Sequence, residues 1–135
     1  MKMNIKKNLL VILARGGSKR IPNKNIRKVN GIPLVCHSVI NAKKTKIFDR
    51  IHVSTDSKKI KKIVERYGVK IDFLRPDKLS GDNIATIPVV KYVVDTYYIK
   101  FKIKYENIFI LSAINPFIKK NDIINAFKFY LKMKK

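Results

Sequence analysis

Short apolar runs alternate along this chain with segments whose apolar residues recur every three or four positions. Residues 8–14 read Asn-Leu-Leu-Val-Ile-Leu-Ala, a nearly continuous apolar run that is typical of a strand buried on both faces of a parallel sheet. Runs at 50–54 and 107–111 predict two more strands. Alternating apolar and polar residues at 69–73 predict another, which Arg75-Pro76 would end.

The segments between these runs have the period of amphipathic helices. Four helices are predicted, at about 33–42, 57–67, 86–97 and 121–131. Thr55-Asp56-Ser57 precedes the second helix and Thr86 opens the third, and such side chains cap helix N-termini. Because strand and helix alternate four times, the pattern predicts one α/β domain over residues 1–135, with a Rossmann-like, mostly parallel sheet and helices on both faces.

The loop at 13–25, LARGGSKRIPNKN, leaves the end of the first predicted strand. Gly16 and Gly17 let the backbone come close to a ligand, and the four cationic side chains of the loop suit a polyphosphate. The spacing is not that of the P-loop, and the chain has no G-x-G-x-x-G motif. On these grounds a phosphate site and an ordinary solvated basic loop remain equally open.

Ligands of parallel α/β sheets bind outside the carboxyl ends of the strands. Three loops leave those ends with polar or constrained residues, at 13–25, 75–86 and 112–117. We therefore expect these three loops to line one cleft.

The charge of the chain changes this picture little. A net charge of +22 invites a nucleic-acid-binding interpretation, but 25 of the 31 cationic side chains are lysines that are spread along the sequence. No recognised nucleic-acid-binding module or aromatic platform accompanies them. We treat most of the charge as background and expect no specific nucleic-acid partner.

The single cysteine and the short apolar segments indicate the cellular compartment. Cys36 stands alone, which excludes an internal disulfide and a cysteine-based metal cluster and fits a reducing environment. No segment reaches the roughly 18 apolar residues that span a bilayer. We expect a cytoplasmic protein without a membrane partner.

Several segments together carry a resemblance to a known family. ILARGGSKRIPNKNIRKVNGIPL, FDRIHVSTD and FLRPDKLSGD, with a Pro-Phe pair after the 107–111 strand, resemble the acylneuraminate cytidylyltransferases from about residue 8 to about residue 125. The ordered set is far more specific than any one motif. The resemblance implies the nucleotide-diphospho-sugar transferase type of fold. It also implies an enzyme that transfers CMP from CTP to a nine-carbon acidic sugar, such as sialic or pseudaminic acid, and releases pyrophosphate.

The resemblance also implies roles for residues of this chain. The 13–25 loop would wrap the CTP triphosphate, with Arg15 and Lys19 as the catalytic cations and Lys24 as a further charge partner. Asn25 would bond a ribose or phosphate oxygen. The residues assigned to the nucleotide are Ala14, Arg15, Gly16, Gly17, Ser18, Lys19, Lys24, Asn25, Arg75, Asp82 and Thr86.

Structural explanations compete with some of these roles. Arg75 and Thr86 would contact cytosine and its surroundings, yet an arginine at a strand end is common on protein surfaces and Thr86 could serve only as a helix cap. Asp82 more plausibly orders the second loop than contacts an anion. Asp56 matches the family, but its local chemistry is that of an N-cap, so we treat it as structural.

Lone histidines and the aromatic residues of the third helix have simpler explanations. His37, in the first helix, and His52, in the second strand, are expected to be packed or solvated, and neither is predicted as a general base. Tyr92, Tyr97, Tyr98 and Phe101 follow helical spacing, which predicts the core and surface of one helix rather than a base-stacking platform.

Two features depart from the family. Residues 112–118 read Ser-Ala-Ile-Asn-Pro-Phe-Ile where many sialic acid members have Gln-Pro-Thr-Ser-Pro-Leu-Arg, which weakly favours the pseudaminic acid branch.

Family members are also much longer, so the chain is expected to be C-terminally truncated. The part without a counterpart here carries the acidic ligands of Mg²⁺, much of the sugar pocket and the arm that makes the homodimer. The resemblance thus implies Mg²⁺ as cofactor without ligands for it in this chain, and a homodimer for the longer proteins rather than for this one.

Two other functions therefore stay open at this stage. A nucleotide-binding remnant would bind CTP without turnover, which the missing metal ligands favour. A basic nucleic-acid-binding protein is favoured by charge alone, and its binding would depend steeply on salt.

Overall fold

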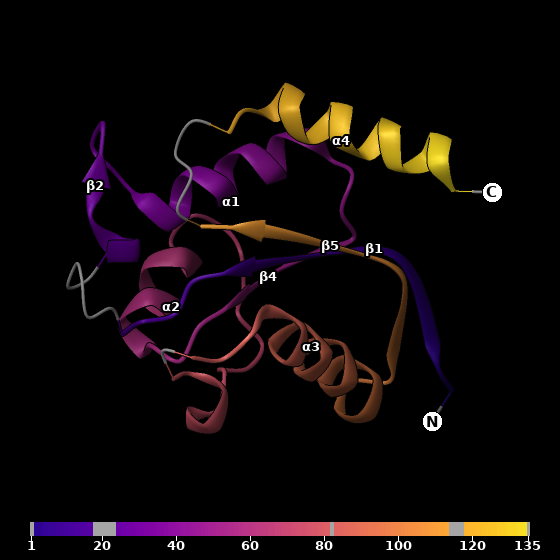
Figure 1. The fold of residues 1–135 in the computed structure, drawn as a ribbon, viewed down its shortest axis with the longest axis horizontal. Helices are drawn as coiled ribbons and strands as arrows, with labels where there is room; N and C mark the ends of the chain where they lie inside the picture. Colours follow the sequence, from indigo (N-terminus) through magenta and orange to yellow (C-terminus); the bar gives the residue numbers. More distant parts are fainter. Residues whose placement is uncertain (1, 18–23, 82, 114–117, 135) are drawn as a thin grey trace.

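The computed structural model describes residues 2–17, 24–81, 83–113 and 118–134. In this part of the chain, three parallel strands form the central sheet in the order β4–β1–β5 (Figure 1). The strands are β1 (Asn4–Leu13), β4 (Arg50–Ser54) and β5 (Ile103–Ser112). Their carboxyl ends therefore lie at one edge of the sheet, where the first predicted loop begins.

The central strand β1 is buried on both faces. Leu10 and Ile12 enter one core cluster, whereas Leu9 and Val11 enter another, and each of the four side chains is at most 2% exposed. Two buried faces require apolar residues at every position, which explains the continuous apolar run in the sequence.

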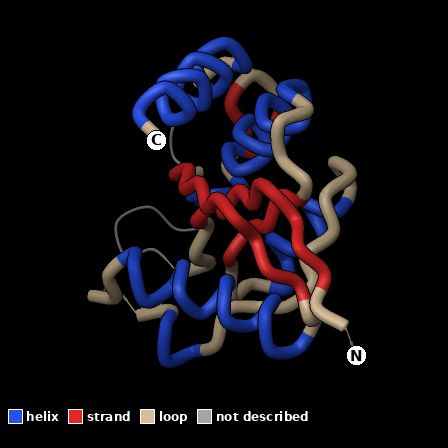
Figure 2. The backbone as a smooth tube through the Cα atoms, turned by 90° about the vertical axis from the view of Figure 1, so that its right-hand side faces the viewer, coloured by secondary structure: helices blue, strands red, loops and turns tan. Residues whose placement is uncertain are grey.

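Helices cover the two faces of the sheet, as Figures 1 and 2 show. Buried residues of the cluster of Leu10 come from α1 (Leu34–Thr45), α2 (Lys58–Glu65) and α4 (Lys120–Met133). The helix α3 (Thr86–Lys100) contributes Val93 and Tyr97 to the cluster of Leu9. The predicted α/β class, with a parallel sheet between helices, is confirmed.

Smaller elements connect these layers. The strands β2 (Lys28–Val29) and β3 (Ile32–Pro33) form an antiparallel hairpin, and short 3₁₀ helices occupy Lys24–Ile26 and Asp77–Leu79. None of the helices in the described ranges has the length and apolar character needed to cross a bilayer.

The predicted strand at 69–73 is wrong. Residues 69–75, all of which are described, form no strand. The Ile71 N–H donates to the Glu65 carboxylate at 3.1 Å rather than to a neighbouring strand. Ile71 is buried in the cluster of Leu10 while Phe73 packs against the cluster of Leu9, so the segment does not keep the two-residue period of a strand.

Two predicted caps are also corrected. Ser57 caps α2, because its hydroxyl accepts the Ile60 N–H at 3.2 Å, and Asp56 bonds elsewhere. Ala85 occupies the N-cap position of α3, and Thr86 is the first helical residue, without a capping hydrogen bond. Neither Asp56 nor Thr86 is therefore explained by helix capping.

Candidate functional site

A cavity of about 200 Å³ lies between the loop that leaves the carboxyl end of β1 and the segment from Arg75 to the first turn of α3. Its wall is formed by Leu13, Arg15, Gly17, Lys24, Asn25, Arg75, Ile84, Ala85, Thr86 and Val89. Two of the three predicted loops thus meet at one cavity. Of the third, residues 114–117 lie outside the described ranges, and the Ala113 N–H donates to the Leu13 carbonyl at 3.3 Å.

Most of the sequence-predicted residues lie at this cavity or directly behind it. Six of the eleven line it, namely Arg15, Gly17, Lys24, Asn25, Arg75 and Thr86. Ala14 is buried in the core at the end of β1, and its N–H donates to the Ser54 carbonyl at 2.9 Å. Ser18, Lys19 and Asp82 lie outside the described residues.

Gly16 fixes the first loop to the turn after β4. Its N–H donates to Asp56 Oδ1 at 2.7 Å, and a Cβ placed on Gly16 would lie 2.7 Å from the Cβ of Ser57. Such a distance is too short for any side chain. Gly16 therefore serves the close approach of two protein segments, and Asp56 holds the loop in place rather than capping a helix.

Asn25 presents a hydrogen-bond acceptor that none of the described residues uses. Its side-chain N–H donates to the Arg15 carbonyl at 2.7 Å, which assigns the amide orientation. The amide oxygen is buried, and the described residues supply no partner for it. A buried polar atom left unpaired costs about 1–3 kcal/mol, so a ligand hydroxyl or amino group that reached this oxygen would remove that cost, whereas a phosphate oxygen would not.

Arg75 is a buried cation whose position is fixed by protein groups. Nε donates to the Ser54 hydroxyl at 3.0 Å, and Nη2 donates to the Ser54 carbonyl at 2.9 Å. Its own backbone N–H donates to the Thr55 carbonyl at 2.7 Å. Of its five N–H donors, some remain for a ligand in the cavity that it lines.

The electrostatics of the cavity favour an anion. Burial lowers the pKa of the Arg75 guanidinium, the Asp56 carboxylate opposes that shift, and Arg15 lowers the pKa further by like-charge repulsion. Arg15 also reaches the Ser80 carbonyl at 3.4 Å, so it bridges the two loops. Two guanidinium groups that repel each other at one wall gain stability when an anion lies between them.

The histidines take no part in this cavity, as the sequence indicated. His52 is 1% exposed, and burial lowers its pKa to about 4, so the ring is neutral near pH 7. His37 Nε2 lies 2.7 Å from the Val29 carbonyl, to which it donates.

Tyr97 lies in the core and Tyr98 on the surface of α3, which matches the predicted division of that helix.

The described residues contain no cluster of metal-ligating side chains. No three His, Cys, Asp or Glu side chains come together within those residues. Asp56, whose charge acts on Arg75, already accepts the Gly16 N–H.

The role of Ser54 escaped sequence reasoning. A serine at the carboxyl end of a buried strand was the available signal, because such a hydroxyl needs a partner that the strand does not supply. The partner is the Arg75 side chain, which lies 21 residues further along the sequence and cannot be paired with it from pattern alone.

Comparison with known proteins gives this geometry a context. The family described as Cytidylyltransferase matches residues 9–135. The chain is 38% identical over 108 residues to CMP-N,N'-diacetyllegionaminic acid synthase from Campylobacter jejuni, with 80% of the chain and 46% of that protein covered. It is 37% identical over 125 residues to pseudaminic acid cytidylyltransferase from Campylobacter jejuni, with 93% of the chain and 53% of that protein covered.

A solved structure shows the same fold. CMP:2-keto-3-deoxy-manno-octonic acid synthetase complexed with CTP superposes with a TM-score of 0.75 at 20% identity, over 95% of the chain and 48% of that protein. The chain spans about half the length of the relatives that it matches.

Proposed function

This chain belongs to the cytidylyltransferase family, and we propose that it binds CTP and takes part in the transfer of CMP to a nine-carbon acidic sugar, with release of pyrophosphate. The observation that carries the proposal is the cavity between the loop after β1 and the segment from Arg75 to the first turn of α3. There the two loops bring Arg15, Lys24 and Arg75 to one wall, together with the unpaired acceptor of Asn25.

The wall provides complementary groups for the two halves of a nucleoside triphosphate. Arg15 and Lys24 neutralise phosphate charge through charge-assisted hydrogen bonds. Asn25 accepts a hydrogen bond from a ribose hydroxyl or from the amino group of cytosine, since its free atom is an oxygen. Lys19, which the family resemblance adds to the phosphate contacts, lies outside the described residues.

In the proposed reaction, the anomeric hydroxyl of the sugar acid attacks the α-phosphorus of CTP. A new P–O bond forms to the sugar oxygen, the bond between the α-phosphorus and pyrophosphate breaks, and the hydroxyl proton passes to water. Catalysis of this kind rests on positioning and charge neutralisation, which is what fixed cations supply. Mg²⁺ would add charge neutralisation across the phosphates, and no step here depends on it.

The class of sugar follows from the names of two relatives. They concern legionaminic and pseudaminic acid, and they match the chain at nearly equal identity, 38% and 37%. We therefore propose a nonulosonic acid as acceptor. The Pro-Phe motif at 116–117 favours pseudaminic acid within that class.

A second candidate is CTP binding without turnover. It is favoured by the absence of an acidic cluster from the described residues. Both candidates predict CTP binding, and only the first predicts pyrophosphate release.

Calorimetric titration with CTP, ATP and GTP, followed by a pyrophosphate-release assay with CTP and pseudaminic acid, tests the proposal. We expect CTP to bind more tightly than either purine nucleotide. Equal binding of all three would indicate simple attraction of polyphosphate to a chain of charge +22, and would overturn the proposed site. Selective CTP binding without pyrophosphate release would support the second candidate.

A further inference from the structure

The segment 69–75 reaches the cavity without being part of the sheet. It follows α2, lies beside β4 and ends at Arg75, which lines the cavity. Strands in a sheet are held in register by backbone hydrogen bonds, but this segment forms no ladder. Apart from the bond between the Arg75 N–H and the Thr55 carbonyl, side-chain contacts must therefore determine where Arg75 lies.

Side chains of β4 supply those contacts at every second residue. Arg50, His52 and Ser54 lie on one face of β4, because alternate residues of a strand share a face. Arg50 pairs with Asp72, His52 stacks on Phe73 with ring centroids 4.5 Å apart, and Ser54 bonds Arg75. A column of side-chain contacts thus replaces the missing ladder.

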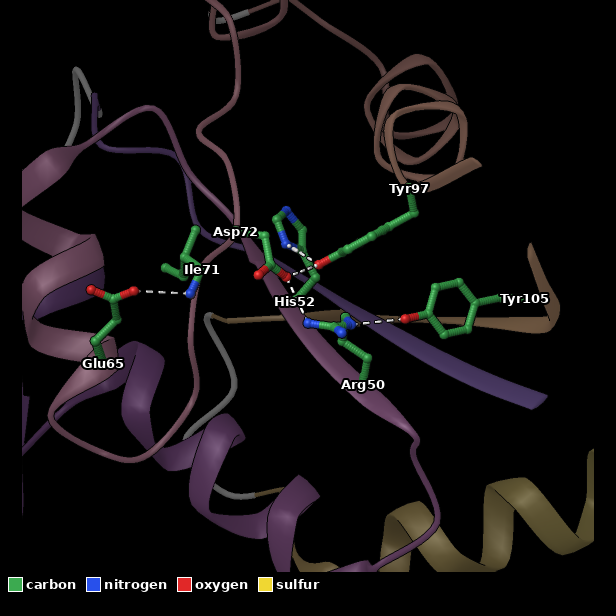
Figure 3. Close-up of polar contacts among 7 residues, drawn as sticks. All are labelled: Arg50, His52, Glu65, Ile71, Asp72, Tyr97 and Tyr105. Atoms are coloured by element: carbon green, nitrogen blue, oxygen red, sulfur yellow. Dashed lines mark hydrogen bonds and ion pairs between the residues drawn. The ribbon is translucent and has the colours of Figure 1, made fainter. Parts of the chain in front are cut away.

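The ion pair at the start of this column is anchored on three elements (Figure 3). Arg50 Nη1 donates to Asp72 Oδ2 at 2.7 Å, and the Tyr97 hydroxyl of α3 donates to the same oxygen at 2.7 Å. Arg50 Nε donates to the Tyr105 hydroxyl of β5 at 2.8 Å. Asp72 is therefore fixed relative to β4, β5 and α3 at once.

The side chain of Asp72 is well shielded from water. It is 9% exposed, whereas the Arg50 side chain is 34% exposed. A shielded carboxylate interacts more strongly with its partners than one in water. Removal of a partner therefore costs more free energy for a shielded carboxylate. Asp72 is thus held more tightly than a surface ion pair would hold it.

Only Phe73 and Leu74 separate Asp72 from Arg75. Phe73 is enclosed by aromatic rings, with centroids 5.0 Å from Tyr97 and 6.0 Å from Phe101. Three residues of chain span at most about 10 Å, and with Phe73 fixed they allow little independent movement at Arg75.

We propose that Asp72 and Arg50 are positioning residues for nucleotide binding, because their ion pair sets the place of Arg75 at the cavity wall. This inference rests on the proposed function of the cavity. Neither residue lines the cavity, so each acts through Arg75 and not by contact with the nucleotide.

A double-mutant cycle on CTP affinity tests the coupling. Asp72→Asn keeps the size of the side chain and weakens the ion pair. We expect it to raise the Kd for CTP by about threefold to tenfold in the native background, and to have no further effect in an Arg75→Ala background. Arg50→Lys, which keeps the charge but loses the planar fork, should show the same dependence on Arg75. Titrations are made well below the midpoint of thermal unfolding, so that loss of folded protein does not contribute.

Asp95→Asn is the matched control. Asp95 pairs with Lys91 on the exposed side of α3, and its substitution changes the net charge by the same amount. Added positive charge alone strengthens attraction to CTP, so the control should leave the Kd unchanged or lower it slightly. An unchanged Kd in Asp72→Asn, or an equal loss in the native and Arg75→Ala backgrounds, would overturn the inference.

Hydrogen exchange separates this inference from the proposed function. The Arg75 N–H is bonded to the Thr55 carbonyl, and Asp72→Asn should reduce its protection while leaving the β1 amides of Val11 and Ile12 as they are. This measurement needs no nucleotide, so it decides the positioning role even if the native chain fails to bind CTP, which would refute the proposed function alone. Unchanged protection of the Arg75 amide, or an equal loss in β1, would refute the positioning role.

Discussion

The carboxylate of Asp56 accepts the backbone N–H of Gly16 at 2.7 Å, and this bond joins the loop after β1 to the turn after β4. The two residues are 40 positions apart in the sequence. The bond places a negative charge behind a wall that otherwise presents Arg15, Lys24 and Arg75. The loop is thereby held close to α2 before any ligand arrives.

Gly16 and Gly17 should respond differently to substitution by alanine. A Cβ on Gly16 would lie 2.7 Å from Ser57 Cβ and 3.1 Å from Asp56 Oδ1, whereas a Cβ on Gly17 would meet nothing within 4 Å. We expect Gly16→Ala to lower the free energy of unfolding by about 1–3 kcal/mol and Gly17→Ala to change it by less than about 0.5 kcal/mol. Chemical denaturation of the two variants measures the difference. Equal stability would show that the loop does not approach α2 as described.

The cationic wall should contribute directly to CTP affinity. Removing one charge-assisted phosphate contact costs about 1.5–3 kcal/mol, so Arg15→Ala and Lys24→Ala should each raise the Kd for CTP by at least about tenfold. Lys100→Ala serves as the control, because Lys100 is exposed at the far end of α3. Calorimetric titration of the three variants with CTP distinguishes direct phosphate contacts from an effect of net charge. If all three variants lose the same small amount of affinity, the effect is one of net charge.

Burial of His52 should make stability depend on pH. Burial lowers the pKa of His52 to about 4 in the folded chain, against an ordinary value of 6.5. The unfolded chain binds the proton more readily between these values, so the contribution of neutral His52 is fully present above about pH 6.5 and is lost as the pH falls toward 4. The loss amounts to roughly 3 kcal/mol.

The variant His52→Gln isolates this effect, since glutamine does not titrate and can still bond the Tyr97 hydroxyl. The difference in unfolding free energy between native chain and variant should shrink as the pH falls from 6.5 to 4. Parallel stability profiles of the two proteins over that range would contradict the assignment.

Turnover by the 135-residue chain should be slow compared with that of a longer relative. Within the described residues, no three His, Cys, Asp or Glu side chains come together to hold a metal ion. We therefore expect CTP to bind while pyrophosphate release stays at least about a hundredfold below that of the Campylobacter jejuni enzyme, since metal ions supply several kcal/mol of transition-state stabilisation. A release rate equal to that of the relative would contradict this expectation.

Local pattern was sufficient for the elements with a single strong signal. The apolar run of β1 lies where the sequence predicts it, because burial on two faces leaves no room for polar residues. The strand at 50–54 is also confirmed. The four helices follow from their apolar period. The glycines and cations of the first loop left a phosphate site and a solvated basic loop equally open, and phosphate binding stays a prediction. Six of the eleven residues that the family resemblance assigned to the nucleotide line one cavity.

Contacts between distant residues decided the points that the sequence left open and the points that its local pattern predicted wrongly. Residues 69–73 alternate like a strand, but Ile71 bonds Glu65 and Asp72 bonds Arg50, so side chains replace the ladder. Asp56 looks like a helix cap, yet its partner is the N–H of Gly16. The physical reason is common to both cases. Apolar period records which side of an element is buried, a local property, whereas a polar side chain takes whichever partner the fold brings within about 3 Å, and that partner is set by the packing of the whole domain.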